Sequence, residues 1–299
     1  MSGKNAPNLS ASRGSALGIW FFRVLIKCGG FRLAKLLAHC VTWFYACFDR
    51  KAYEATRNYL ELRFPGDKND KRKMKRHFHR LIDQLACNLC GAFAFSCGRK
   101  VIIEERNKND VGGGQVIVLA HFGCWQAAMP LLKQPGHDAY IMARPDKNGN
   151  MDKFLAFGGK SGLHIISTEG FSGGLVEASA VLDKGGNVII MGDRAVDATG
   201  SGKAPFFGGE LELPLSPWML AARCQKPVTV VFLDWEDDTH RKIIVEYDTS
   251  ITVPEIGDRR IRQDDLQTML NAYAAKLEER CRRAPYSFYR FSNEKVTGN

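Results

Sequence analysis

The sequence lacks an uncharged apolar run of the length that a transmembrane helix needs. Residues 17–48 are rich in leucine, phenylalanine and tryptophan. Basic side chains interrupt this stretch repeatedly: Arg23, Lys27, Arg32, Lys35 and His39. Because a bilayer-spanning helix needs about 20 consecutive apolar residues, the stretch predicts no membrane span. Residues 1–16 are polar and small and lack the apolar core of a secretory signal, so we expect no cleaved leader.

The sequence also lacks a disulfide-type cysteine pattern and the common nucleic-acid-binding motifs. Nine cysteines are scattered without the pattern of a disulfide framework, which predicts reduced thiols and a cytosolic compartment. Cys87 and Cys90, with His77 and His79 upstream, lie at helical spacing on an apolar segment, so we predict core thiols and no metal site. No zinc-finger, homeodomain or RNA-recognition pattern accompanies the formal net charge of +10, so we predict no nucleic-acid partner.

The composition and the alternation of elements indicate one α/β core. The 299 residues are 45% hydrophobic, which suffices for a large core. Beyond residue 110, apolar runs alternate with helical segments, which predicts a mixed, mainly parallel sheet flanked by helices. We predict strands at 116–120, 139–143, 163–167, 187–191, 227–233 and 242–247. We predict helices near 125–133, 174–184, 217–225 and 264–283. The expected units are a polar tail at 1–16, a helical segment at 17–110 and the core at 111–299.

The segment at 17–48 is expected to form two helices separated at Gly29 and Gly30. In the second helix, polar residues recur at helical spacing and leave apolar residues to the other faces: Arg32, Lys35, His39 and Thr42 against Leu33, Leu36, Leu37, Trp43 and Phe44. This pattern fits a helix in a membrane interface, with its cationic side toward lipid headgroups. It fits equally well a helix that packs on the main domain.

Residues 71–80 are the densest basic run and open a further helical segment. Such a run is usually a solvated helix face. Here it can also dock the acidic headgroups of an anionic membrane or an acidic partner protein.

His121 is the most informative residue, because it lies where the apolar run 116–120 gives way to a helix. An imidazole at the carboxyl end of a buried strand faces a crevice and titrates near neutral pH, as a general base must. A hydrogen-bonded structural histidine is the alternative.

Several blocks follow one another in a fixed order: His121-Phe122-Gly123-Cys124-Trp125-Gln126, Arg144-Pro145-Asp146-Lys147-Asn148, Gly192-Asp193-Arg194 and Pro205-Phe206-Phe207-Gly208. In this order the sequence resembles the lysophospholipid acyltransferase superfamily, in particular the lauroyl and myristoyl transferases that complete lipid A. The resemblance covers roughly residues 15–292. It implies a cofactor-free enzyme at the cytoplasmic face of the inner membrane. The enzyme would move a fatty acyl group from an acyl carrier protein or coenzyme A thioester to a hydroxyl or amine of a lipid or glycolipid.

The resemblance makes His121 the general base, but the family's carboxylate five residues later is replaced by Gln126. A glutamine can accept a hydrogen bond from the imidazole but cannot neutralise an imidazolium. Either another carboxylate serves, with Glu169 and Asp193 as candidates, or the protein is a catalytically silent homologue that binds a lipid or carrier.

Arg144 and Arg194 are the expected cations for a phosphate, a carboxylate or an oxyanion, because a guanidinium binds oxyanions bidentately. For Arg144 the resemblance implies an active-site role. For Arg194 a salt bridge to Asp193 or Asp197 is the alternative.

The remaining candidates are substrate contacts: Gly123, Trp125, Asn148, Phe206 and Phe207. The two phenylalanines, together with Trp218, line an acyl-chain groove in one interpretation and belong to the core in the other.

A competing motif is the sequence Gly170-Phe171-Ser172-Gly173-Gly174, which matches the nucleophile elbow of an α/β-hydrolase with Ser172 as nucleophile. His240 alone among the histidines follows Ser172, and it lies in a charged turn well before the chain end. We therefore favour acyl transfer over hydrolysis.

Overall fold

A computed structural model of the protein describes residues 16–108, 112–131, 139–144, 163–169, 173–194, 200–256 and 260–291. Its centre is a mixed seven-stranded sheet in the order β1-β9-β8-β2-β5-β3-β4. Neighbouring strands are parallel except for β8 and β9. The strands are β1 (Ile102–Arg106), β2 (Val116–Leu119), β3 (Ala139–Ala143), β4 (Leu163–Ser167), β5 (Asn187–Met191), β8 (Val228–Trp235) and β9 (Lys242–Asp248). The predicted α/β class, with a mainly parallel sheet flanked by helices, is confirmed.

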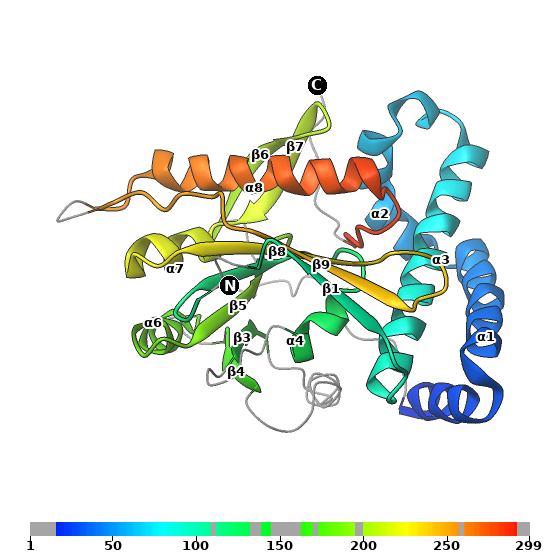
Figure 1. Ribbon diagram of the computed structural model, residues 1–299. Helices are drawn as coiled ribbons and strands as arrows, with labels where there is room; N and C mark the ends of the chain where they lie inside the picture. The colour runs from blue at the N-terminus through cyan, green and yellow to red at the C-terminus, as the bar shows by residue number, and fades with distance from the viewer. Residues whose placement is uncertain are drawn as a thin grey trace, which may run out of the picture.

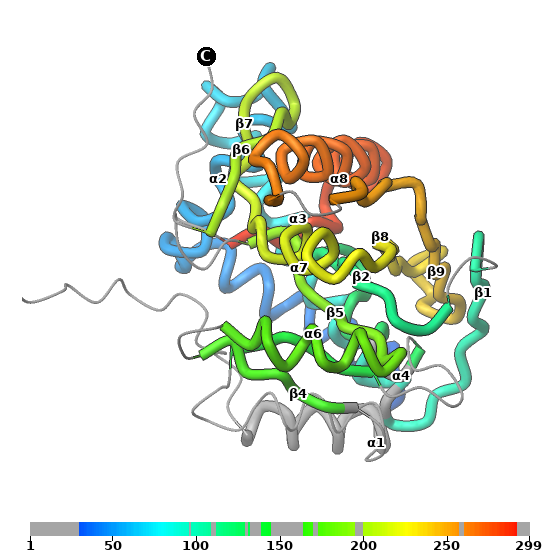
Figure 2. The backbone as a smooth tube through the Cα atoms, turned by 90° about the vertical axis from the view of Figure 1, so that its left-hand side faces the viewer, coloured from blue at the N-terminus to red at the C-terminus, as the bar shows by residue number. Residues whose placement is uncertain are grey.

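Helices cover the sheet and stand at one side of it (Figure 1). Helix α8 runs across one face, and the first three helices form a separate stack beside the sheet. The helices are α1 (Ala16–Phe48), α2 (Arg50–Arg63), α3 (Lys71–Ser96), α4 (Ala128–Leu131), α6 (Leu175–Asp183), α7 (Ser216–Cys224) and α8 (Gln263–Arg283). The short 3-10 turns within the described ranges are η1 (Pro65–Asp67) and η3 (Trp125–Ala127). In Figure 2, α7 lies between α8 and β2, consistent with its contacts to both.

Both faces of the central strands are buried, which explains their continuous apolar sequences. In β2, Val116 and Val118 belong to the larger core cluster, which includes side chains of α6, α7 and α8. Ile117 and Leu119 point to the opposite cluster, which includes Ala128 of α4. The sheet is therefore rigid where β2 ends, immediately before His121.

Two elements differ from the sequence-based expectation. β1 lies in the segment expected to be helical and pairs in parallel with the edge of the sheet at β9. A separate antiparallel hairpin, β6 (Ser201–Phe206) and β7 (Gly209–Pro214), was not predicted. Its two-residue turn uses Phe207 and Gly208, both with positive φ, which is the backbone geometry of tight hairpin turns.

The predicted break in the N-terminal helical segment is confirmed, because α1 is interrupted at Gly30, where φ is +74°. Of the two alternatives left open for the second half, the one with its cationic side toward lipid headgroups is wrong for Lys35, His39 and Thr42, which face the protein. Lys35 donates to the carbonyl of Asp238 (2.9 Å), and both His39 (2.6 Å) and Thr42 (2.9 Å) bond to Asp83 of α3. These hydrogen bonds hold Lys35, His39 and Thr42 against the protein.

The apolar side of α1 consequently faces outward. Leu36 (60% exposed), Trp43 (64%), Phe44 (57%) and Phe48 (70%) form this outward face. We call these four residues the α1 apolar face. No helix within the described ranges is long and apolar enough to cross a membrane.

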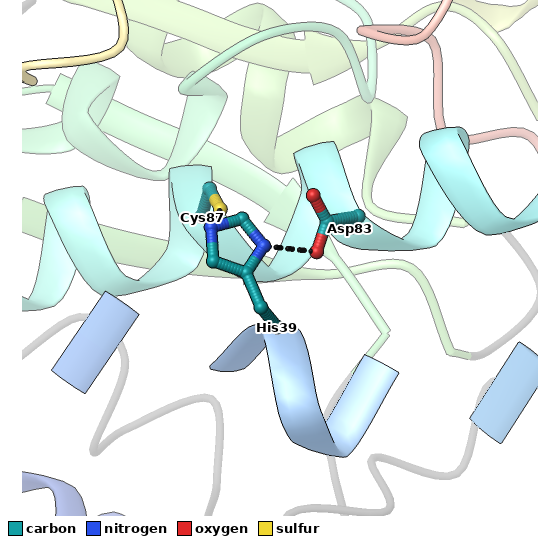
Figure 3. A group of neighbouring side chains, drawn as sticks. All are labelled: His39, Asp83 and Cys87. Atoms are coloured by element: carbon teal, nitrogen blue, oxygen red, sulfur yellow. Dashed lines mark hydrogen bonds and ion pairs between the residues drawn. The ribbon is translucent and has the colours of Figure 1, made fainter. Parts of the chain in front are cut away.

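Figure 3 shows how α1 is tied to α3. His39 bonds to Asp83 through Nδ1, while its Nε2 lies 3.9 Å from the Cys87 sulfur. Burial raises the pKa of Cys87 to about 12 and that of Cys90 to about 11, so both thiols stay protonated. Among the cysteine side chains that the structure describes, none forms a disulfide.

Candidate active site

The carboxyl ends of adjacent parallel strands bring the predicted polar residues to one edge of the sheet. His121 follows β2, Asp193 follows β5 and Arg144 follows β3, and these three strands are neighbours in the order β2-β5-β3. In open α/β sheets, ligand sites lie outside this edge. The topology therefore assembles the candidate site from segments that are far apart in the chain.

His121 and Asp193 form the centre of this site. The Nδ1 atom of His121 lies 2.9 Å from Oδ1 and 3.1 Å from Oδ2 of Asp193, whose side chain is fully buried. An ionised carboxylate can only accept, so Nδ1 carries the proton and Nε2 keeps a free lone pair. The ring of Trp125 meets the imidazole edge-on, with centroids 4.8 Å apart. The imidazole is thus oriented by a carboxylate on one nitrogen and is available as a base on the other.

The electrostatics keep this pair as a neutral imidazole and a charged carboxylate. Burial lowers the pKa of His121 below its usual value; Asp193 opposes this effect and Arg194 adds to it. Burial alone would raise the pKa of Asp193, but His121, Arg194 and Arg290 together lower it to about 2. At neutral pH, His121 is therefore ready to take a proton.

Gly123 shapes the turn after His121. Its φ is +56°, and a Cβ atom would overlap the carbonyl oxygen of Leu233 in β8 and lie 3.0 Å from the carboxyl carbon of Asp234. The following amide, of Cys124, donates to the same Leu233 oxygen at 3.0 Å. Glycine is required here because the turn packs directly on β8.

The two predicted cations lie in different surroundings. Arg194 is half-buried, with its Nε 3.8 Å from Oδ2 of Asp193, so the expected salt bridge to Asp193 is present. It also donates to the carbonyl of Tyr289. Arg144 is exposed at the end of β3.

Of the two alternative carboxylates, the structure brings only Asp193 to His121. Glu169 is exposed after β4, and no hydrogen bond or ion pair joins it to His121 in the described part of the chain. Gln126 is 6% exposed, and its Oε1 has no hydrogen-bond partner among the described residues. Asn148, Ser172 and Asp197 lie outside the described residues.

The aromatic candidates belong mostly to the core. Phe206 and Trp218 have no exposed surface, so in this structure they line no open groove; this corrects the expectation that Phe206 contacts substrate. Phe206 packs against Tyr59 and Phe288. Phe207 is partly exposed, and two guanidinium groups, of Arg63 and Arg282, lie over its ring.

Sequence reasoning missed four residues next to the site: Asp234, Ser287, Tyr289 and Arg290. Asp234, near the end of β8, is half-buried, and its desolvation raises its pKa to about 6. The signal for Asp234 was a carboxylate near the end of the apolar run of β8. The others follow α8 in a short aromatic stretch that has no motif of its own.

A His–Asp pair with a buried carboxylate, at the carboxyl edge of a mainly parallel sheet, defines an α/β protein equipped for general-base chemistry. The chain belongs to the bacterial lipid A biosynthesis acyltransferases, whose family model matches residues 7–294. This confirms the resemblance drawn from the order of the sequence blocks. No curated protein matches the chain.

Proposed function

We propose that this protein is a membrane-associated acyltransferase. In this proposal it moves a fatty acyl group from an acyl carrier protein or coenzyme A thioester to a hydroxyl or amine of a lipid or glycolipid. The observation that carries the proposal is the pairing of His121 Nδ1 with the buried carboxylate of Asp193 at 2.9 Å. Asp193 thereby supplies the charge that Gln126 cannot supply.

In the reaction, His121 Nε2 takes the proton of the acceptor as its oxygen or nitrogen attacks the thioester carbonyl carbon. The carbon–sulfur bond then breaks, and the imidazolium returns the proton to the departing thiolate. Asp193 holds the imidazole in the useful tautomer and stabilises the imidazolium. Arg144 and Arg194 are the cations that we assign to the oxyanion or to a phosphate of the acceptor.

Membrane attachment is supported by the α1 apolar face, since contiguous exposed apolar side chains mark interaction surfaces. The basic side chains at the start of α3 are exposed and add attraction to anionic headgroups or to an acidic carrier protein: Lys71, Arg72, Lys75 and Arg76. We therefore expect the protein at the cytoplasmic face of the inner membrane.

A catalytically silent homologue that binds a lipid or carrier is the second candidate. Gln126 favours it, because the family carries a carboxylate at this position. Under this alternative, the His121–Asp193 pair would be a structural hydrogen bond.

The test is the transfer of labelled acyl groups from acyl carrier protein and coenzyme A thioesters to lipid A precursors. His121→Ala is expected to lower the rate by ~10²–10⁴-fold, the usual contribution of a general base. His164→Ala is the matched control, since His164 is exposed on β4 and stacks on Tyr140. Equal rates in wild type and His121→Ala would contradict the mechanism, and binding without transfer would favour the silent homologue.

A further inference from the structure

The chain after α8 returns to the site and pairs with the turn that carries His121. We call residues 285–290 the C-terminal strap. The amide of Tyr289 donates to the carbonyl of His121 (2.8 Å), and the amide of Gly123 donates to the carbonyl of Ser287 (2.7 Å). Between them, Phe122 and Phe288 form an antiparallel bridge. Two consecutive backbone hydrogen bonds thus fix the position of the histidine main chain.

The strap is itself anchored to the N-terminal helices. Tyr59 of α2 donates through its hydroxyl to the carbonyl of Pro285 (2.7 Å). Asn88 of α3 donates to the hydroxyl of Tyr289 (2.7 Å), and both of these side chains are buried. The ring of Phe288 is fully buried in the main core. The strap is therefore a fixed element and not a loose terminus.

Arg290 ends the strap and connects it to the second residue of the pair. Its side chain is 3% exposed, and its guanidinium donates to the carbonyl of Asp193 and, through Nη2, to that of Glu212 in β7 (3.0 Å). Arg194, the residue after Asp193, donates to the carbonyl of Tyr289. One short segment therefore contacts the main chain of His121 and of Asp193 at once.

We propose that the C-terminal strap is the positioning element of the acyl-transfer site, with Arg290 as the positioning residue that holds Asp193 in register with His121. The proposal rests on the proposed function for its catalytic consequence, but its geometric content can be measured without substrate. A planar guanidinium reaches two carbonyls at fixed geometry, which no other side chain reproduces.

The matched variants are Arg290→Gln, Arg290→Lys and Arg283→Gln. Glutamine removes the charge and cannot reach both carbonyls, while lysine keeps the charge and can keep one hydrogen bond. Arg283 pairs with Glu279 on the exposed side of α8 and contacts neither residue of the pair, so it controls for the loss of an arginine near the C-terminus. Asp193→Asn is the reference for a broken pair.

The measurement is NMR titration of the histidine side chains of the full-length protein, with nitrogen shifts reporting the tautomer of His121. In wild type we expect a proton fixed on Nδ1. In Arg290→Gln we expect mixed tautomers and a His121 pKa displaced downward, toward that of Asp193→Asn, because the opposing effect of Asp193 is weakened. Arg290→Lys should lie between, and Arg283→Gln should match wild type. Acyl transfer should fall ~10-fold or more in Arg290→Gln.

If His121 in Arg290→Gln keeps the tautomer and the titration that it has in wild type, the proposal is overturned. This holds even if the melting temperature of the variant falls, because Arg290 would then only stabilise the fold. If Arg290→Gln does not fold, unchanged tautomer and titration in Arg290→Lys would overturn it. If wild type transfers acyl groups measurably and Arg290→Gln does so at the same rate, the proposal would also be overturned. If the expected NMR changes are seen but neither wild type nor any variant transfers acyl groups, the result would support the positioning role and contradict the proposed function.

Discussion

Replacing Asp193 with asparagine tests whether this carboxylate has taken over the role lost at Gln126. Asparagine keeps the size of the side chain and can still accept a hydrogen bond from His121 Nδ1, but it carries no charge. Charge-assisted hydrogen bonds contribute about 1.5–3 kcal/mol. Since each ~1.4 kcal/mol corresponds to a tenfold change in rate, Asp193→Asn should slow acyl transfer about 10- to 150-fold.

The same substitution has a predicted effect on stability. The pKa of Asp193 is about 2 in the folded protein, below its unfolded value near 3.8. A lowered carboxyl pKa stabilises the fold above the unfolded pKa, and this contribution is lost as pH falls through the folded pKa. The free energy of unfolding of wild type should therefore fall by about 2 kcal/mol more than that of Asp193→Asn between pH 4 and pH 2.

The assay is the initial rate of thioester consumption with acceptor present, measured beside a thermal melt at neutral pH. Glu169→Gln is the control, since Glu169 is the other carboxylate that sequence reasoning singled out. If Asp193→Asn is folded and its rate of acyl transfer is within twofold of wild type, Asp193 is not the charged partner that His121 needs. A large loss in Glu169→Gln would transfer the role to that residue.

Three further predictions follow from single features of the structure. Gln126→Glu should leave turnover level or lower it and cost about 1–3 kcal/mol of stability, because it buries a second acid; a tenfold gain would show that Asp193 does not serve. Asp234→Asn should raise the free energy of unfolding at pH 8 by about 1–2 kcal/mol. The reason is that the raised pKa of Asp234 makes wild type less stable as pH rises through about 6, whereas asparagine does not ionise. A melting temperature of the variant equal to or below that of wild type would contradict this. Trp43→Ser combined with Phe48→Ser should release the protein from anionic vesicles, whereas unchanged sedimentation with vesicles would assign attachment to another surface.

The central strands were predictable because buried parallel strands are continuous apolar runs, and the runs at 116–120 and 187–191 match β2 and β5 within one residue. β1 was missed because only Ile102 and Ile103 are apolar among its five residues, as suits an exposed edge strand. The hairpin β6–β7 was missed because glycine, proline and lysine in β6 argue against a strand on propensity alone.

A site residue could be predicted only where the residue type and the strand directly before it in the sequence were enough to identify it. His121 could be found from a histidine after an apolar run, but its pairing with Asp193 depends on β2 and β5 being neighbours, and a sequence does not state strand order. The same holds for Arg290, which is 97 residues from Asp193 in the chain. The orientation of α1 stayed open at the level of sequence, because helical periodicity separates a polar side from an apolar one without indicating which side meets the protein.

The most direct test of the central claim is mass spectrometry of lipids from cells that lack the protein and that make either wild type or His121→Ala at equal levels. If the protein is an acyltransferase with His121 as its general base, only the cells that make wild type should contain a lipid or glycolipid with one additional fatty acyl group. The same acylated lipid in the His121→Ala cells, or no difference between wild-type and deficient cells, would contradict the account.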